Sequence, residues 1–221
     1  MTPDRRLRLG VVLGAAGIVV VAVAVVAVVA GVAIGRGTGD GAAPDEGSVD
    51  VGFARDMARH HDQAVELAEL VRDRTDDADI RLLAKDIALT QQAQIGEMRG
   101  WLDVWGRAPT SVGPPMQWMD HPADQAMPGL ASDDEITALT AAEGVEAETV
   151  FLELMIRHHQ GGIHMASAAA DTADEEFVRR LAGGMVESQQ AEVDYMADLL
   201  AERGVDYRGV AASPTAPASD E

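Results

Sequence analysis

Residues 155–166 read MIRHHQGGIHMA, in which two adjacent histidines follow a methionine. Residues 57–68 read MARHHDQAVELA, so Met-x-Arg-His-His occurs twice, 98 residues apart. When residues 53–106 are aligned with residues 151–204 without a gap, 17 of the 54 positions are identical, more than unrelated segments share by chance. The chain therefore contains an internal duplication, and this determines how every local pattern is interpreted.

Each copy has the pattern of a helical hairpin, because apolar residues recur at three- and four-residue steps and strand patterns are missing. We predict helices over 49–74 and 77–105 in the first copy, and over 147–170 and 175–202 in the second. Two hairpins with one apolar stripe each bury those stripes best against one another. The sequence therefore predicts an all-α fold, an antiparallel four-helix bundle built from a duplicated helical hairpin.

The segment between the copies, 107–146, contains several prolines and interrupts the helical pattern. A loop of this length in a compact domain is usually functional or disordered. Within it, Ser-Asp-Asp-Glu at 132–135 predicts a capping box at the start of a short helix of about ten residues. Thr-Ala-Asp-Glu at 172–175 predicts a second capping box, at the start of the last helix.

The amino-terminal region has the features of a membrane anchor. The chain runs without a charge from Leu9 to Ile34, which as a helix would be about 39 Å long, against a hydrocarbon thickness of about 30 Å. Three arginines precede this stretch and one follows it closely, which places the amino end in the cytoplasm. We expect a single-pass protein of the cell membrane with an extracytoplasmic domain, although Val-Val-Ala-Gly at 28–31 leaves signal cleavage open. The predicted segments are a cytoplasmic amino end (1–8), a transmembrane signal-anchor helix (9–35), a flexible tether (36–47), the duplicated domain (48–204, with repeat 1 at 48–106, the linker at 107–146 and repeat 2 at 147–204) and a disordered tail (205–221).

The composition excludes several classes of function. A formal net charge of -20 argues against nucleic acid as a partner and favours cations. Because the chain has no cysteine, disulfides, thiolate zinc sites and iron–sulfur clusters are excluded. A soft metal ion would have to be bound by imidazole or by the thioethers of the 10 methionines.

The doubled histidines have a geometric consequence. At about 100° per residue, Met155, His158, His159 and Gly162 fall on one helical face about 120° wide, whereas His164 falls on the opposite side. One histidine of each pair can then face the bundle axis while its neighbour faces the flank. The small residues beside them leave room for an ion, and two His-His pairs and two methionines could converge across an approximate twofold axis.

The sequence predicts three groups of site residues. The metal ligands are Met57, His60, His61, Met155, His158, His159 and Met165. A second candidate site in the linker comprises Met116, Met119, His121 and Met127. The neutral amides of Gln91, Gln92, Gln189 and Gln190 are predicted to orient the imidazoles from behind.

Ligand chemistry favours copper. Thioether sulfur prefers Cu(I), and imidazole also suits copper, so we expect Cu(I) rather than Cu(II). Iron in a carboxylate-bridged bundle would need Glu-x-x-His, which the sequence lacks. We expect copper buffering, transport or resistance without catalysis, with a copper-trafficking protein as a further partner. Two alternatives stay open: a structural or interaction bundle whose buried histidines bond to Gln91 and Gln189, and a redox enzyme or b-type haem protein. The oligomeric state is not indicated.

Three motifs carry a family resemblance. Phe-x-x-x-Met-x-x-His-His at 53–61, Met-Pro-Gly at 127–129 and Phe-Leu-x-Leu-Met-Ile-x-His-His-x-Gly-x-Ile-x-Met-Ala at 151–166 resemble the bacterial domain-of-unknown-function family 305, which includes the CopM-like copper-binding proteins. The resemblance covers about residues 48–204. It implies a ferritin-like four-helix bundle outside the cytoplasmic membrane that binds copper through methionine and histidine. The residues it implies as ligands are Met57, His60, His61, Met155, His158, His159 and Met165. Leu67 departs from the pattern, since the second copy has Met165 at that place.

Overall fold

The computed structural model describes residues 42–111 and 113–207. The predicted transmembrane helix, the first half of the tether and most of the tail lie outside these residues. No helix within the described part is long and apolar enough to cross a membrane.

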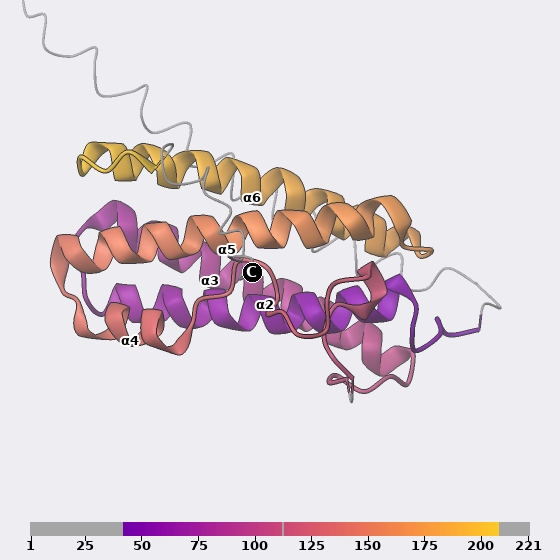
Figure 1. The fold of residues 1–221 in the computed structure, drawn as a ribbon. Coiled ribbons are helices and arrows are strands. Elements are labelled where there is room, and N and C mark those ends of the chain that lie inside the picture. Colours follow the sequence, from indigo (N-terminus) through magenta and orange to yellow (C-terminus); the bar gives the residue numbers. More distant parts are fainter. Residues whose placement is uncertain (1–41, 112, 208–221) are drawn as a thin grey trace, which may run out of the picture. The chain divides into compact units, whose positions relative to one another are not determined.

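The described residues form helices and no strand, which confirms the all-α prediction. Four of the helices are long and one is short, and the bounds of the long ones agree with the predicted bounds to within three residues. The elements are α2 (Val49–Arg72), α3 (Ala78–Val104), the 3-10 turn η1 (Gln117–Met119), α4 (Asp133–Ala141), α5 (Gly144–Thr172) and α6 (Glu176–Glu202) (Figure 1).

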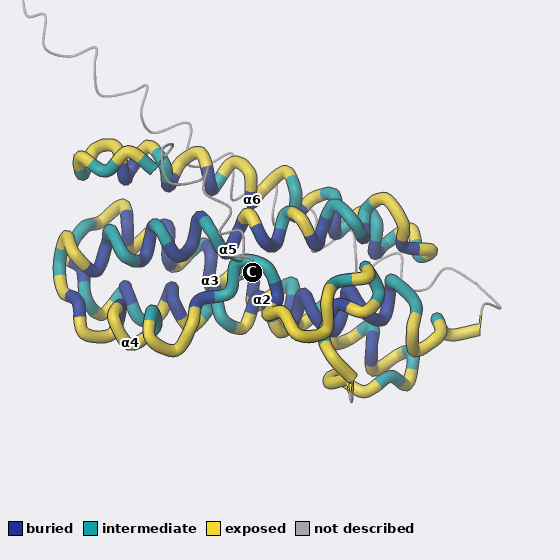
Figure 2. Tube along the Cα trace, viewed as in Figure 1, coloured by how far each residue is buried: buried dark blue, intermediate teal, exposed yellow. Residues whose placement is uncertain are grey.

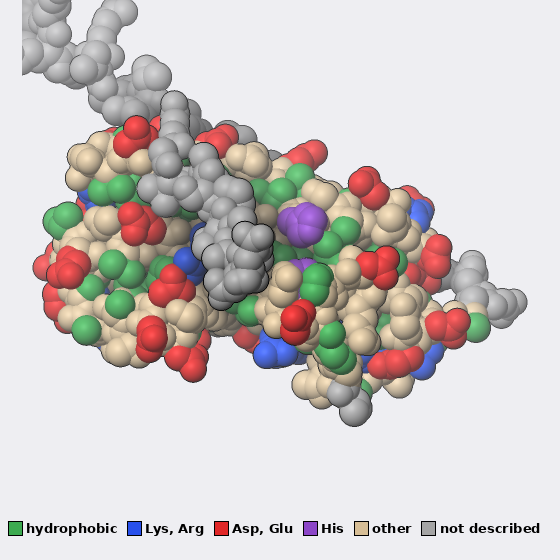
Figure 3. All heavy atoms as spheres, viewed as in Figure 1, with side chains coloured by type: hydrophobic (Ala, Val, Ile, Leu, Met, Phe, Trp, Pro, Cys, Tyr) green, Lys and Arg blue, Asp and Glu red, His purple; other side chains and the backbone are tan. Residues whose placement is uncertain are grey.

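The long helices pack as two hairpins, α2 with α3 and α5 with α6, and the hairpins meet where α2 lies along α5. Their facing sides are buried and their outer sides are exposed (Figure 2). Acidic side chains are spread over the face shown in Figure 3, in keeping with the excess of 37 acidic over 17 basic residues.

The core has two halves, and their composition shows the antiparallel arrangement. One half combines the end of α2 with the start of α5, for example Leu67 with Phe151. The other combines the start of α2 with the end of α5, for example Phe53 with Met165. The two copies are therefore related by an approximate twofold axis that passes between α2 and α5.

The two predicted capping boxes have different outcomes. The box at Ser132 is present, because Glu135 N donates to the Ser132 hydroxyl and Glu135 accepts from Ser132 N. The prediction of a capping box at 172–175 is wrong, because α5 continues through Thr172 and no side chain at the start of α6 makes a capping hydrogen bond. Instead, the buried carboxylate of Asp50 on α2 accepts from the backbone N–H groups of Asp174 and Glu175. A residue from the other repeat therefore caps α6.

Candidate metal site

The four paired histidines lie near the middle of α2 and α5. Their side chains are fully or almost fully buried, between the two apolar halves of the core. The face predicted from helical geometry is confirmed, because Met155, His158, His159 and Gly162 are all buried. His164, predicted to lie on the opposite side, is exposed.

His60 and His158 form an inner pair. Their ring centroids are 3.9 Å apart, with the ring planes inclined by 35°. His60 Nε2 lies 3.0 Å from the carbonyl oxygen of Pro128, and His158 Nε2 lies 2.9 Å from the carbonyl oxygen of His60. This pair therefore joins the two repeats directly and also joins them to the linker.

His61 and His159 form an outer pair, and each faces the second helix of its own repeat. His61 Nε2 lies 2.8 Å from Oε1 of Gln94 on α3. His159 Nε2 lies 2.6 Å from Oε2 of Glu192 on α6. The prediction that one histidine of each pair faces the axis and the other the flank is confirmed.

The hydrogen bonds determine which nitrogen of each ring carries the proton. Every Nε2 atom faces an oxygen that accepts: two backbone carbonyls, an amide oxygen and a carboxylate. In the neutral imidazole the proton is then on Nε2, and Nδ1 holds a lone pair. All four Nδ1 atoms are buried, and none has a hydrogen-bond partner among the described residues.

Burial keeps His60, His61 and His158 neutral. It lowers the pKa of His60 to about 4, against a smaller upward effect of the Pro128 carbonyl. Burial, together with the adjacent His60, lowers the pKa of His61 to about 3. The pKa of His158 lies well below 6.5 for the same first reason, together with the charges that His60 and His159 would carry. At neutral pH these rings therefore have the uncharged form that binds metal ions.

The four imidazoles do not form one shared site. The described residues contain no group of three or more histidine, aspartate or glutamate side chains that could hold a metal ion. The expected convergence of both His-His pairs on one centre is therefore wrong, because the outer rings face away from the axis. The ligands that histidine and carboxylate side chains do not supply would have to come from other groups, such as the sulfur atoms of the buried methionines.

The predicted methionine ligands are buried but lie in different parts of the core. Met57 and Met165 share one half of the core, and Met155 lies in the other. The half with Met57 is rich in thioethers; its buried methionines are Met57, Met98, Met116, Met127, Met165 and Met185. The structure therefore separates Met155 from Met57 and Met165.

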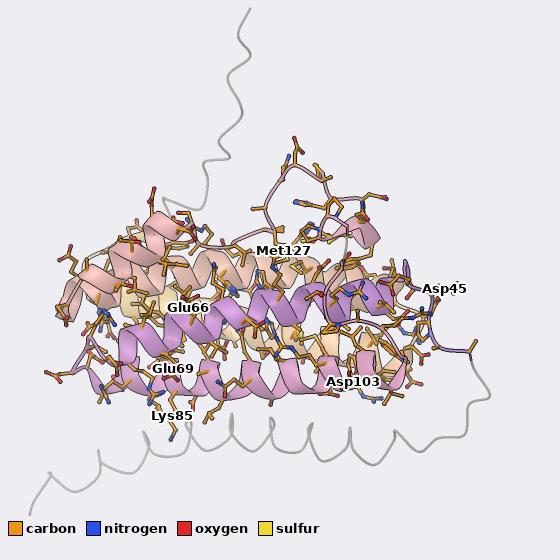
Figure 4. All side chains as sticks on the ribbon, turned by 90° about the horizontal axis from the view of Figure 1, so that it is seen from below. Asp45, Glu66, Glu69, Lys85, Asp103 and Met127 are labelled. Carbon is orange, nitrogen blue, oxygen red and sulfur yellow. The ribbon has the colours of Figure 1, made fainter. Side chains whose placement is uncertain are left out.

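The linker residues of the second candidate site are only partly brought together. Met116 and Met127 are buried in the same half of the core as Met57, and Met119 packs against it. Figure 4 shows Met127 where the linker returns to the middle of the helices. His121 instead bonds to the carbonyl oxygen of Ala126 within the linker itself.

The glutamines predicted to orient the imidazoles make none of the histidine hydrogen bonds described above. Gln91 and Gln189 are buried, and the Gln91 amide and Gln189 Oε1 have no partner among the described residues. Gln92 is exposed, and Gln190 bonds to Asp194 on its own helix. The room expected beside the helix at Gly162 is filled by the Gln189 amide. The prediction for these glutamines is wrong, because the histidine partners lie almost one turn further along α3 and α6.

Segment 127–131 of the linker, which we call the strap, covers the inner pair. Gly129, at φ 79°, packs against the backbone of Arg157 and His158, and Gly161 faces the Pro128 carbonyl where a Cβ would collide. The side-chain amide of Gln63 donates to Ala131 O at 2.9 Å and accepts from Ala131 N at 2.7 Å. These contacts hold the Pro128 carbonyl at His60.

The sequence analysis missed two pairs of residues that occupy matching positions in the two copies: Gln94 with Glu192, and Met98 with Met196. The first pair, Gln94 and Glu192, provides the oxygens that face the outer histidines. These bonds also set the helix register, which brings Met98 level with Met57 and Met196 level with Met155. All four of these methionines are buried. The pair Met98 and Met196 could have been found from the sequence, because both copies have methionine at this position. Gln94 and Glu192 could not be found in this way, because the two copies differ there.

Comparison with known proteins agrees with this architecture. A DUF305 protein of Streptomyces coelicolor, assigned as secreted, is 51% identical over 73% of this chain and 98% of its own, with a TM-score of 0.70. A DUF305 fragment from Deinococcus radiodurans is 34% identical over 70% and 96%, with a TM-score of 0.60. CopM in its Cu(I)-bound form is 25% identical over 69% and 96%, with a TM-score of 0.53, and a silver-bound form matches similarly.

No curated protein sequence matches the chain. The model of the family described as "Domain of unknown function (DUF305)" matches residues 50–200. This confirms the resemblance that the sequence motifs carried. The chain belongs to the DUF305 family.

Proposed function

We propose that this protein binds copper, as Cu(I), through the Nδ1 atoms of its buried histidines and the sulfur atoms of neighbouring methionines. The observation that carries the proposal is the state of the four rings. Each Nε2–H group is used by an oxygen acceptor, and each Nδ1 lone pair is buried without a donor. Metal-ligating histidines typically have this arrangement, because an acceptor on the second nitrogen fixes the tautomer and orients the ring.

The donor set fits a soft, monovalent ion. Burial keeps His60, His61 and His158 neutral by lowering the pKa of each ring, the methionines are neutral, and the described residues offer no cluster of three carboxylates or imidazoles. A divalent hard cation would need oxygen ligands, whereas thioethers favour Cu(I). The solved CopM structures include Cu(I)-, silver- and Cu(II)-bound forms, which supports copper binding here, and the preference for Cu(I) rests on the thioether ligands.

The cellular role follows from this chemistry as part of the proposal. We assign buffering, transport or resistance to copper rather than catalysis, with handover to a copper-trafficking protein. We also assign a ferritin-like arrangement to the four long helices. We also assign an extracytoplasmic position with a membrane anchor, supported by the assigned secretion of the Streptomyces coelicolor relative and by the apolar stretch from Leu9 to Ile34.

Competition with a chromophoric Cu(I) chelator tests the proposal. The informative variant is His61→Gln with His159→Gln, because the amide nitrogen of glutamine can replace the Nε2–H donor while Nδ1 is removed. We expect the full chain to withdraw Cu(I) from the chelator, and the double variant to lose at least tenfold in affinity. His164→Gln, at an exposed histidine on α5, is the matched control and should bind as the wild type does.

A structural bundle without metal is the second candidate. It is favoured by the observation that every paired histidine already has one hydrogen bond and that no three acidic or imidazole groups gather. Under this alternative the wild type would take no Cu(I) from the chelator, and the double glutamine variant would differ from it only in stability.

A further inference from the structure

The two repeats are unequal at one matching position behind their outer histidines. Position 94 is glutamine, and position 192, 98 residues later, is glutamate. The His61–Gln94 bond is 2.8 Å long, and the His159–Glu192 bond is 2.6 Å long. The two rings are otherwise alike, since both are fully buried and both have an unpartnered Nδ1.

A carboxylate and an amide have different effects on the ring in front of them. When Nδ1 binds a cation, positive charge spreads into the imidazole and its Nε2–H becomes a stronger donor. A carboxylate behind that N–H stabilises the charge and makes Nδ1 a better donor to the metal ion, whereas a neutral amide does this only weakly. Glu192 is 26% exposed, so solvent reduces this advantage without removing it.

Nearby charges reinforce the difference. The pKa of Asp86 on α3 is raised mainly by burial; the adjacent Lys85 lowers it, and the charge of Glu192 raises it, so the two carboxylates lie close enough to interact. The position matching Asp86 in the second repeat is Gly184, so the first repeat has no equivalent carboxylate beside Gln94. The surroundings of His159 therefore favour a cation more than the surroundings of His61 do.

We propose that the two outer histidines bind metal with unequal affinity, and that the ligand set of His159 with Met155 fills before that of His61 with Met57. This inference rests on the proposed function and concerns the order of filling. Removal of outer partners of metal-binding histidines typically changes affinity by about 10- to 100-fold. We expect the two sites to differ by about tenfold. The protein would then bind the first ion tightly and exchange the second one more easily.

Titration of the full chain, labelled with 15N at histidine, tests the order directly. The probe is Ag(I), which is soft and redox-inert, and the readout is the 15N chemical shift of each Nδ1. His61→Gln and His159→Gln assign the two signals. We expect the His159 Nδ1 signal to shift during the first equivalent and the His61 Nδ1 signal during the second.

Two further variants, which exchange carboxylate and amide groups at positions 94 and 192, extend the test. Glu192→Gln should bring the two affinities within about twofold of each other, and Gln94→Glu combined with Glu192→Gln should reverse the order of filling. Glu187→Gln is the matched control, because it removes the same charge from an exposed site on α6 and should leave the order unchanged. Circular dichroism checks that each variant is folded.

The outcomes separate this inference from the proposed function. Simultaneous shifts of both signals in the wild type, or an unchanged order in the double exchange, would overturn the inference and leave copper binding standing. Absence of any Nδ1 shift at excess Ag(I) would overturn both.

Discussion

His60 and His158 face each other across the approximate twofold axis, with ring centroids 3.9 Å apart, and His158 donates to the backbone carbonyl oxygen of His60. A residue and its duplicate are thus in direct contact. This contact places a polar layer between the two apolar halves of the core. Because each ring is fixed by its Nε2–H bond, the Nδ1 positions are set by the fold before any ion arrives.

Replacing Met57 and Met155, one helical turn before the paired histidines, tests the thioether ligands. Met57→Leu with Met155→Leu keeps the size and apolar character of the side chains, so the cost in stability should stay below about 1.5 kcal/mol per site. Removal of a sulfur ligand should weaken Cu(I) binding at least tenfold, as measured by chelator competition. Met185→Leu, at a buried methionine outside the predicted set, is the control and should bind normally. Equal binding by all three proteins would show that methionine sulfur is not used.

The buried histidines make the free energy of unfolding depend on pH. Their pKa values are lowered in the folded state, to about 4 for His60 and about 3 for His61, against 6.5 for an exposed ring. Above pH 6.5 both states are neutral. Below it only the unfolded chain takes up the proton, so each ring lowers stability by up to about 1.4 kcal/mol per pH unit until the folded-state pKa is reached. Protons should therefore compete with a metal ion at His60 only toward pH 4.

Denaturation at a series of pH values measures this effect. Asp56 acts in the opposite direction, because burial raises its pKa and its folded form takes up a proton first. The comparison is therefore made between the wild type and His60→Gln, which removes one titrating ring. Between pH 6 and pH 5 the slope should be smaller in the variant by about 1 kcal/mol per pH unit. Identical slopes would mean that His60 is already protonated in the folded protein.

The strap can be displaced by adding one methyl group. A Cβ at Gly161 would collide with the Pro128 carbonyl, so Gly161→Ala should move the strap and break the bond between His60 and Pro128. We expect a loss of about 1–3 kcal/mol in the free energy of unfolding. Gly184→Ala has open space around the new Cβ and should instead stabilise α6 by about 0.5–1 kcal/mol. The contact would be unimportant if both variants gained stability.

The anchor of the linker on α2 gives a separate prediction. The carboxylate of Asp56 accepts from Met116 N at 2.6 Å and from Trp118 Nε1 at 3.0 Å. Asp56→Asn weakens both bonds and should cost about 1–3 kcal/mol, with a red shift of tryptophan emission as Trp118 becomes exposed. Asp62→Asn breaks only an exposed ion pair with Arg99 and should change stability by less than about 1 kcal/mol. An unchanged emission spectrum in Asp56→Asn would contradict the anchoring role.

Much of the fold was predictable from the sequence, because the duplication and the helical periodicity act over short distances along the chain. The bounds of the four long helices, the buried faces around Met57 and Met155, and the capping box at Ser132 all follow from local spacing. The cap of α6 was not predictable in this way, since Asp50 reaches it from a helix 124 residues earlier in the chain.

The candidate site was predictable in its residue types and not in its arrangement. Helical geometry shows that His60 and His61 diverge, but the direction of each ring depends on the register of α3 and on the path of the strap. Both are set by tertiary contacts, such as Gln94 with His61 and Pro128 with His60. For this reason Gln91 and Gln189, which are identical in the two repeats, were a misleading signal.

The central claim is that the free Nδ1 lone pairs of the buried histidines bind a soft ion together with methionine sulfur. Crystals of the full chain soaked in Cu(I) under anaerobic conditions, with data collected on both sides of the copper absorption edge, test it most directly. We predict anomalous peaks inside the bundle, beside Nδ1 of His159 and His61. Peaks confined to surface carboxylates, with the interior empty, would contradict the claim.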